Sequence, residues 1–322
     1  MFSVFAFDCL IDCVFYYLVT MSLLELLTLS EESEDSNEID WNIVKSIVNN
    51  DNSSVKEKNE KGYLPLHLAC ENNAPRDVIK LLLELYHDAI KEKGRNGFLP
   101  LHCACFRGSN IDAIKLLIEA YPDSVREKSD KDQILPLECA FFGRATIDVI
   151  ELLLEAYPDS VKEKNTNQSL PLHNACEDGA TIEVIKLLVD AYPDATKEKD
   201  NQDFLPLTYA FNKNAPFDVI KLLIEVYPDS VKEKDGNSFY PLHYACLSSA
   251  PFDLILQLVE AYPDAAKEKL DDGEVPLHLA CRSGATIDVI KLLVDTYPDS
   301  VKESGSGSLP LHYACKKDNV ST

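Results

Sequence analysis

The sequence has too few basic residues for a protein that binds nucleic acid. Its 322 residues include 31 Lys and Arg against 54 Asp and Glu, which gives a formal net charge of −23. Affinity for phosphate groups comes from clustered Lys and Arg, so DNA, RNA and anionic membrane surfaces are disfavoured as partners. A basic protein or peptide fits this charge better, unless the charge serves only to keep a long surface soluble.

Glycine is scarce, and the apolar N-terminal stretch is too short to span a membrane. Only 11 glycines occur, while 46% of the residues are hydrophobic and 26% are charged, as in ordinary folded domains. The largely apolar stretch 13–24 has 12 uncharged residues, whereas a spanning helix needs about 20. Asp8 and Asp12 precede this stretch, where a signal peptide carries Lys or Arg.

The sequence also lacks the signatures of metal sites and of common enzyme classes. None of its ten cysteines forms a Cys-x-x-Cys pair of the kind that binds zinc. There is no glycine-rich phosphate loop and no kinase signature. No histidine has a Ser, Cys or carboxylate partner outside the repeat pattern described next, so a catalytic triad is unsupported. We therefore expect no enzymatic activity, no cofactor and no metal.

What the sequence does contain is a short pattern that recurs eight times. Its full form is Leu-Pro-Leu-His, as at residues 64–67, and weaker copies such as residues 135–138 keep the Pro-Leu pair. The marker prolines are residues 65, 100, 136, 171, 206, 241, 276 and 310, so successive copies lie 34–36 residues apart. A period of this size is typical of solenoids, in which equivalent units stack on one another.

Each repeat predicts two helices and a loop. In residues 170–200, Pro171 suits the first turn of a helix, and residues 179–180 (Gly-Ala) end that helix. Thr181 is placed to cap a second helix, which Tyr-Pro-Asp at residues 192–194 stops, and residues 195–200 form a polar loop. First helices are expected near 65–73, 100–108, 136–143, 171–178, 206–213, 241–248, 276–283 and 310–317. Second helices are expected near 76–86, 111–121, 147–157, 182–192, 217–227, 252–262 and 287–297.

Six cysteines occupy one equivalent position of the repeat, namely Cys70, Cys105, Cys176, Cys246, Cys281 and Cys315. Stacked helices place equivalent atoms roughly 8–10 Å apart, whereas a disulfide needs Cα atoms within about 7 Å. We expect small, buried, unbonded thiols in a reducing compartment.

These features resemble the ankyrin-repeat family. Residues 62–70 (GYLPLHLAC), followed by residues 78–83 (VIKLLL), match the family pattern nearly position for position, and the resemblance covers residues 42–322. It implies an all-α solenoid of helix–turn–helix units with projecting finger loops, and buried, neutral marker histidines bonded to the finger backbone. The Thr that usually caps the first helix is replaced by Leu, Tyr or Val, which removes about 1 kcal/mol of capping per unit.

Two units depart from the pattern at two positions each. Glu138 and Thr208 replace the marker histidine, and Phe141 and Phe211 replace the cysteine three residues later. Positions three apart share a helix face. We expect the larger ring to fill the space that the imidazole occupies in the other units.

The sequence divides into three parts. Residues 1–30 are an apolar N-terminal segment, residues 31–41 an acidic linker, and residues 42–322 an array of one half unit, seven full units and a C-terminal half unit. Three interpretations of residues 1–30 stay open: a targeting or anchoring segment, an amphipathic helix packed on the first unit, or residues absent from the mature protein. The last unit is either a polar cap or the end of a fragment.

The resemblance implies a protein-binding surface on the concave face formed by first helices and fingers. Partner contacts in such arrays usually come from the residue before the marker and from the two residues after the Ala-Cys pair. The candidates are Tyr63, Phe98, Phe106, Arg107, Phe142, Phe204, Phe239 and Leu247. Aromatic residues at positions that face solvent are the usual anchors of an interface. The alternative is that these rings pack on adjacent fingers and compensate for the missing caps.

The sequence therefore predicts a non-enzymatic interaction module or scaffold that binds a protein partner with a basic or extended segment. The alternative function is a regulatory or anchoring subunit of a larger assembly, tethered through the apolar N-terminus. We expect a monomeric, intracellular, cytoplasmic protein that contacts a membrane only if residues 1–30 do so.

Overall fold

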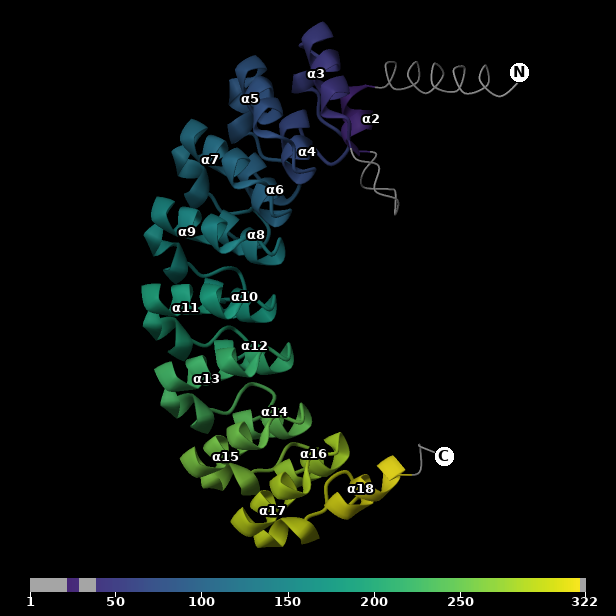
Figure 1. The fold of residues 1–322 in the computed structure, drawn as a ribbon, viewed down its shortest axis with the longest axis vertical. Helices are drawn as coiled ribbons and strands as arrows, with labels where there is room; N and C mark the ends of the chain where they lie inside the picture. The colour runs from purple at the N-terminus through teal and green to yellow at the C-terminus, as the bar shows by residue number, and fades with distance from the viewer. Residues whose placement is uncertain (1–21, 29–38, 319–322) are drawn as a thin grey trace, which may run out of the picture. The chain divides into compact units, whose positions relative to one another are not determined.

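The computed structural model describes residues 22–28 and 39–318, and within them every regular element is helical. The predicted all-α class is confirmed. Each repeat consists of a first helix, a tight turn, a second helix and a 3-10 turn that leads into the finger (Figure 1). The first helices are α4 (Pro65–Glu71), α6 (Pro100–Phe106), α8 (Pro136–Phe142), α10 (Pro171–Glu177), α12 (Pro206–Asn212), α14 (Pro241–Leu247), α16 (Pro276–Ser283) and α18 (Pro310–Asp318). The second helices are α5 (Arg76–Leu85), α7 (Ile111–Ala120), α9 (Ile147–Ala156), α11 (Ile182–Ala191), α13 (Phe217–Val226), α15 (Phe252–Ala261) and α17 (Ile287–Thr296).

The chain forms two compact units, one ending at Ser160 and the other starting at Val161. In the first unit α4, α6 and α8 lie side by side, and α5, α7 and α9 form a second layer against them. In the second unit α10, α12, α14, α16 and α18 stack in the same way, covered by α11, α13, α15 and α17.

The core lies between these layers. First helices that have neighbours on both sides are short and mostly buried: in α4 only Glu71 is outside the core. The last first helix, α18, is largely exposed. Second helices bury one stripe, as in α5, where Val78, Ile79, Leu82 and Leu83 face inward. The spacing of these four residues places them on one side of a helix with 3.6 residues per turn. The opposite side of each second helix is exposed and carries its charged residues.

The second helices end one residue earlier than predicted. Tyr121, expected as the last helical residue of α7, is its C-cap, with φ −143° and ψ 84°. A following proline disfavours helical backbone in the residue before it, and Tyr121 precedes Pro122. Tyr86 adopts the same conformation before His87, so packing reinforces this ending where no proline follows.

The segment predicted as a polar loop begins instead with a 3-10 turn. The turns are η2 (Ser54–Lys56), η3 (His87–Lys91), η5 (Pro122–Arg126), η6 (Pro158–Lys162), η7 (Pro193–Lys197), η8 (Pro228–Lys232), η9 (Pro263–Lys267) and η10 (Pro298–Lys302). In η7, Ala195 and Thr196 are buried rather than solvated. The predicted cap by Thr181 is also wrong, since its side chain makes no capping hydrogen bond to α11.

The array opens on a helix that the predicted half unit did not include. Helix α2 (Leu23–Thr28) packs against α4 and against α3 (Trp41–Asn50), and it buries Leu23, Leu26 and Leu27. Asn72 Nδ2 donates to the carbonyl of Leu27 at 2.8 Å, which ties α2 to the end of α4. Residues 23–28 therefore follow the packed-helix interpretation, while residues 1–21 and most of the predicted linker lie outside the described residues. No helix in the described part of the chain is long and apolar enough to cross a membrane.

Candidate binding surface

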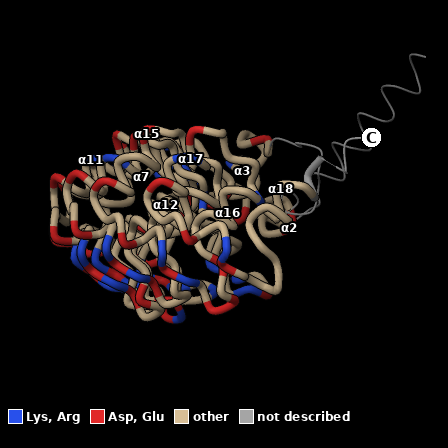
Figure 2. Tube along the Cα trace, turned by 90° about the horizontal axis from the view of Figure 1, so that it is seen from below, with Lys and Arg blue, Asp and Glu red and all other residues tan. Residues whose placement is uncertain are grey.

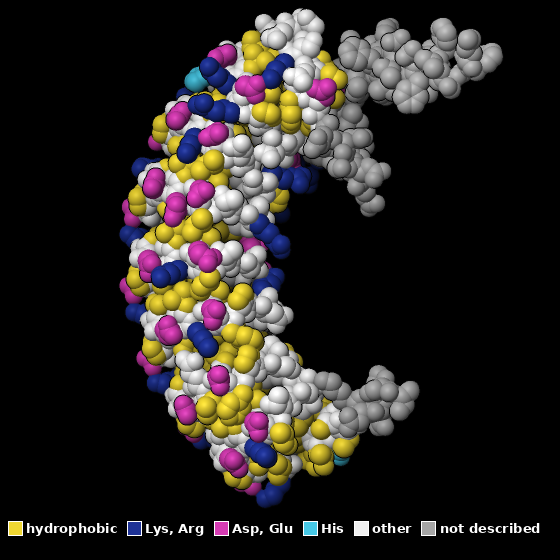
Figure 3. Space-filling view, viewed as in Figure 1, with side chains coloured by type: hydrophobic (Ala, Val, Ile, Leu, Met, Phe, Trp, Pro, Cys, Tyr) yellow, Lys and Arg dark blue, Asp and Glu magenta, His cyan; other side chains and the backbone are white. Residues whose placement is uncertain are grey.

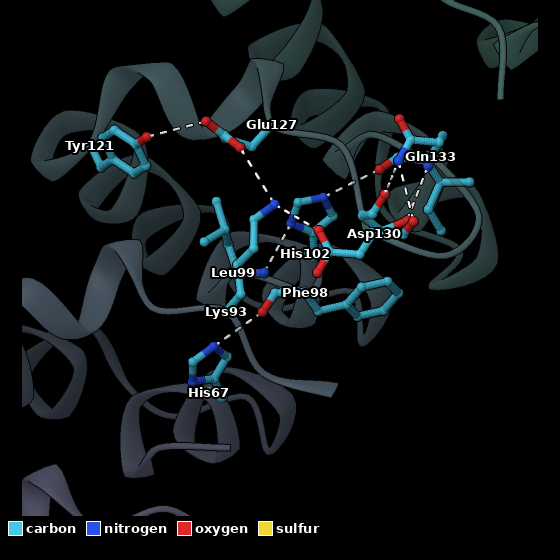
Figure 4. Close-up of polar contacts among 11 residues, drawn as sticks. His67, Lys93, Phe98, Leu99, His102, Tyr121, Glu127, Asp130 and Gln133 are labelled. Carbon is cyan, nitrogen blue, oxygen red and sulfur yellow. Dashed lines mark hydrogen bonds and ion pairs between the residues drawn. The ribbon is translucent and has the colours of Figure 1, made fainter. Parts of the chain in front are cut away.

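The marker histidines fix the fingers to the first helices. His67 Nδ1 accepts the N–H of Leu64 at 3.2 Å, and its Nε2 donates to the carbonyl of Glu92 at 2.9 Å in the finger that leads to the next repeat. Burial lowers the pKa of His67 to about 4, so the ring is neutral at pH 7. Equivalent bonds from ring to finger carbonyl are made by His102, His173, His243 and His278 (Figure 4).

The same histidines supply part of the capping that Thr would provide. Because the ring nitrogen accepts from the N-cap backbone N–H, one of the unpaired donors at the start of each first helix is satisfied. Where Glu138 replaces histidine, its Oε2 takes over this bond from Leu135 N–H at 2.7 Å. Phe211 stacks at 5.9 Å on Tyr244 of the next repeat, and the marker imidazole of His173 contacts the equivalent Tyr209, so the expected substitution of ring for imidazole stays a prediction.

The rings before the marker lie against the first helices. Tyr63 and Phe204 are 9% and 8% exposed. The expectation that these two face solvent is wrong, whereas Phe98 and Phe239 are half-buried. Tyr63 stacks on His67 at 5.4 Å and Phe98 on His102 at 5.3 Å. These rings therefore pack on the marker histidines of their own first helices, whereas the alternative interpretation placed them on adjacent fingers.

The residues after the Ala-Cys pair are the ones that face solvent. Phe106 and Phe142 are 41% and 47% exposed in the first unit, with ring centroids 6.0 Å apart. Arg107 is exposed and donates from Nη2 to Glu71 Oε1 at 3.3 Å. Leu247 is 44% exposed in the second unit. Within each unit, apolar patches also reach the surface between scattered charges (Figure 3).

Charged residues of both signs lie along the fingers (Figure 2). Lys93 Nζ lies 2.9 Å from Asp130 and 3.8 Å from Glu127 of the next finger (Figure 4). The same link between consecutive fingers joins Lys58 to Glu92, Lys164 to Glu198, Lys199 to Glu233 and Lys269 to Glu303. These pairs are largely exposed, and each contributes at most about 1 kcal/mol to stability. They connect consecutive fingers without adding much to the stability of the fold.

A pocket opens in the first unit between two fingers and two first helices. Its volume is about 210 Å³, and it is lined by Lys61, Tyr63, Glu71, Arg95, Asn96, Phe98, Cys103 and Phe106. Sequence reasoning found its three aromatic residues and missed the other five. In the sequence, these five residues look like ordinary positions of a single repeat. Only the packing of neighbouring repeats shows that they line the same pocket.

The cysteines at residues 70, 103, 105, 139, 176, 246 and 281 are free thiols. Cys315 is exposed and Cys281 is half-buried, rather than buried as expected. Burial raises the pKa of Cys70 and Cys105 well above that of a free thiol, so both are protonated and poorly nucleophilic. In residues 22–28 and 39–318 no three His, Cys, Asp or Glu side chains cluster in a way that could hold a metal ion.

Comparison with protein families identifies one family model. A family model for ankyrin repeats in three copies matches residues 35–129, 137–235 and 242–322. No curated protein matches the chain.

Proposed function

Because the chain belongs to the ankyrin-repeat family, we propose that it is a non-enzymatic module that binds a protein partner on the surface of its first helices and fingers. Ankyrin repeats are generally protein–protein interaction modules and typically lack enzymatic activity. The proposal extends this general role to a particular set of side chains and to a class of partner.

The observation that carries the proposal is the pair of exposed rings at the ends of α6 and α8. Phe106 and Phe142 occupy the same position in consecutive repeats, and they contact each other while staying over 40% exposed. Exposed aromatic pairs of this kind bury a large area when a partner covers them, and aromatic residues dominate binding energy at interfaces. Arg107 extends the surface beside Phe106, and Leu247 occupies the same repeat position in the second unit.

The charge of the protein favours a basic, extended partner segment. The net charge is −23, and carboxylates such as Glu71 lie at the ends of first helices. Opposite charge speeds encounter and rejects acidic competitors. An extended segment fits because a row of equivalent positions, one per repeat, presents contacts along a line.

Alanine substitution tests the proposal. A pull-down with the whole chain as bait first identifies the partner, and Phe106→Ala and Phe142→Ala should then each weaken capture at least fivefold. The melting temperature should change little, because both rings are already exposed. Phe217→Ala is the control, since Phe217 is 37% exposed at the start of a second helix and should leave capture unchanged. Unfolding of the array by the first two substitutions, with capture falling only in proportion, would show that these rings are structural.

The anchoring alternative depends on residues outside the described part of the chain. Residues 23–28 are engaged in α2, so an anchor would have to lie in residues 1–21. Imaging the full chain beside residues 22–322 distinguishes the two functions, because only an anchor predicts a change of location. We propose that the protein is cytoplasmic, so both forms should distribute evenly through the cytoplasm.

A further inference from the structure

We propose that the pocket of the first unit receives an arginine side chain of the partner segment. This inference rests on the proposed function and names the chemistry that one part of the surface recognises. It is carried by three features of the pocket: a buried carboxylate oxygen with no donor, aromatic walls held in place by their neighbours, and basic residues that are confined to the exposed rim.

The carboxylate of Glu71 is only half satisfied. Its Oε1 accepts from Arg107, whereas its Oε2 is buried and has no hydrogen-bond partner among the described residues. The side chain as a whole keeps 18% of its surface exposed and lines the pocket. The last torsion of a glutamate is soft, so a small rotation turns Oε2 toward an incoming donor. A buried, unpaired carboxylate oxygen favours a cationic donor over a neutral one.

The aromatic walls are ordered before any ligand arrives. Phe98 stacks on His102 with an angle of 17° between the rings, and Phe106 leans on Phe142. Tyr63 stacks on His67 and lies so close to Gly94 that a Cβ there would meet its ring. Guanidinium groups stack on aromatic faces better than ammonium groups do, and the planar fork matches a carboxylate. Arginine is therefore preferred over lysine.

The basic residues that line the pocket do not prevent an arginine side chain from binding there. Lys61 and Arg95 are exposed at the finger tips, where water weakens their repulsion of a second cation. Glu71 lies deeper, with less surface in water, so its attraction acts through a lower effective dielectric. The two rim residues are instead placed to meet backbone carbonyls or an acidic neighbour of the bound arginine.

Titration of the full chain with N-acetyl-arginine amide tests the proposal. The probe should shift the aromatic resonances of 13C-labelled Phe98 and Phe106, with a dissociation constant of the order of 1 mM for a ligand of this size. N-acetyl-citrulline amide has the same shape without the charge and should bind at least tenfold more weakly. Glu71→Gln should weaken arginine binding at least fivefold. Glu177→Gln is the matched control, since Glu177 has the same repeat position and pairs with Lys213 at 3.5 Å, and it should have no effect.

Three results would overturn the proposal: equal binding of the citrulline probe, stronger binding of N-acetyl-glutamate amide, or arginine binding unchanged by Glu71→Gln in a variant with wild-type circular dichroism. The proposed function fails separately, if Phe142→Ala leaves partner capture intact. If Phe142→Ala abolishes partner capture but the unmodified chain does not bind the arginine probe, only the assignment of the pocket to arginine is wrong.

Discussion

At the scale of single residues, the repeats differ in how well each residue suits its backbone conformation. The turn between the two helices of a repeat needs a positive φ, which Gly108, Gly179 and Gly284 adopt readily. Arg144 occupies the same position in its own repeat with φ 50°. Non-glycine residues are strained there, because Cβ approaches the following carbonyl oxygen.

Arg144→Gly should therefore stabilise the protein by about 0.5–1 kcal/mol. The side chain of Arg144 is exposed and makes no hydrogen bond or ion pair in the described structure, so its removal costs little. Urea unfolding would measure the change. Gly143→Ala, one residue earlier, should do the opposite, since a Cβ at Gly143 would lie 2.6 Å from the carbonyl oxygen of Phe106. A destabilising Arg144→Gly would show that the arginine has a structural role.

The buried histidines predict that stability falls in mild acid. Burial lowers the pKa of His67, His102, His173 and His243 to about 4, whereas an unfolded histidine titrates near 6.5. Between these values the unfolded chain binds more protons, so the free energy of unfolding is greatest above pH 6.5 and falls toward pH 4. Each histidine contributes up to about 1.4 kcal/mol per pH unit in this window.

Urea midpoints at pH 7, 6 and 5 test this pH dependence. They should fall at each step, before most carboxylates titrate. His173→Gln removes one titrating group and should flatten the slope. A midpoint that is flat from pH 7 to 5 would mean that these rings are not buried in the neutral state.

At the scale of elements, several fingers are organised by one side chain near their start. Asp200 Oδ1 accepts the N–H groups of Gln202 and Phe204, both at 2.9 Å, and its Oδ2 accepts from Tyr209 at 2.7 Å. Asn165 makes the same two backbone bonds in another finger. Where a side chain organises the finger, its acceptor oxygen therefore does not require a charge.

Two replacements of Asp200 should separate the effect of its acceptor oxygen from the effect of its charge. Asp200→Asn keeps the acceptor and should cost less than about 1 kcal/mol, whereas Asp200→Ala leaves two backbone N–H groups without a partner and should cost about 2 kcal/mol. Thermal unfolding would rank the two variants. Equal losses would indicate that the pairing of the carboxylate with Tyr209, rather than the backbone turn, stabilises this finger.

At the scale of the whole molecule, the excess negative charge opposes the compact state. With a net charge of −23, self-repulsion extends beyond the paired fingers. Raising NaCl from 20 to 200 mM shortens the screening length from about 20 Å to about 7 Å, which weakens this repulsion more than it weakens exposed ion pairs of at most about 1 kcal/mol.

The melting temperature should therefore rise over this range of salt. Sucrose at matched osmolality serves as the control, because any effect it has acts without screening charge. A melting temperature that falls with NaCl would mean that the Lys–Glu links between fingers outweigh the net repulsion.

The sequence by itself determined the repeat, the helix pairs and the role of the marker histidines. The helices follow from local patterns, with proline at the first helical turn and apolar residues at helical spacing, and the bonds of the histidines to the fingers follow from the family resemblance. The bond from each ring to the N-cap N–H became clear only in the structure. The family assignment follows from the same patterns, since eight copies in phase leave little freedom in how each one folds.

Only the tertiary structure decided which side chains face solvent. Tyr63 and Phe106 are both aromatic at variable positions, yet the finger folds back over the first and leaves the second exposed. Leu23 to Thr28 carry no marker, and their helix is defined by packing on α4. The pocket brings Glu71 to Arg95 and Phe106 from two different repeats. Burial and pairing of this kind depend on neighbours about 30 residues away in the chain, and a local pattern contains no information about them.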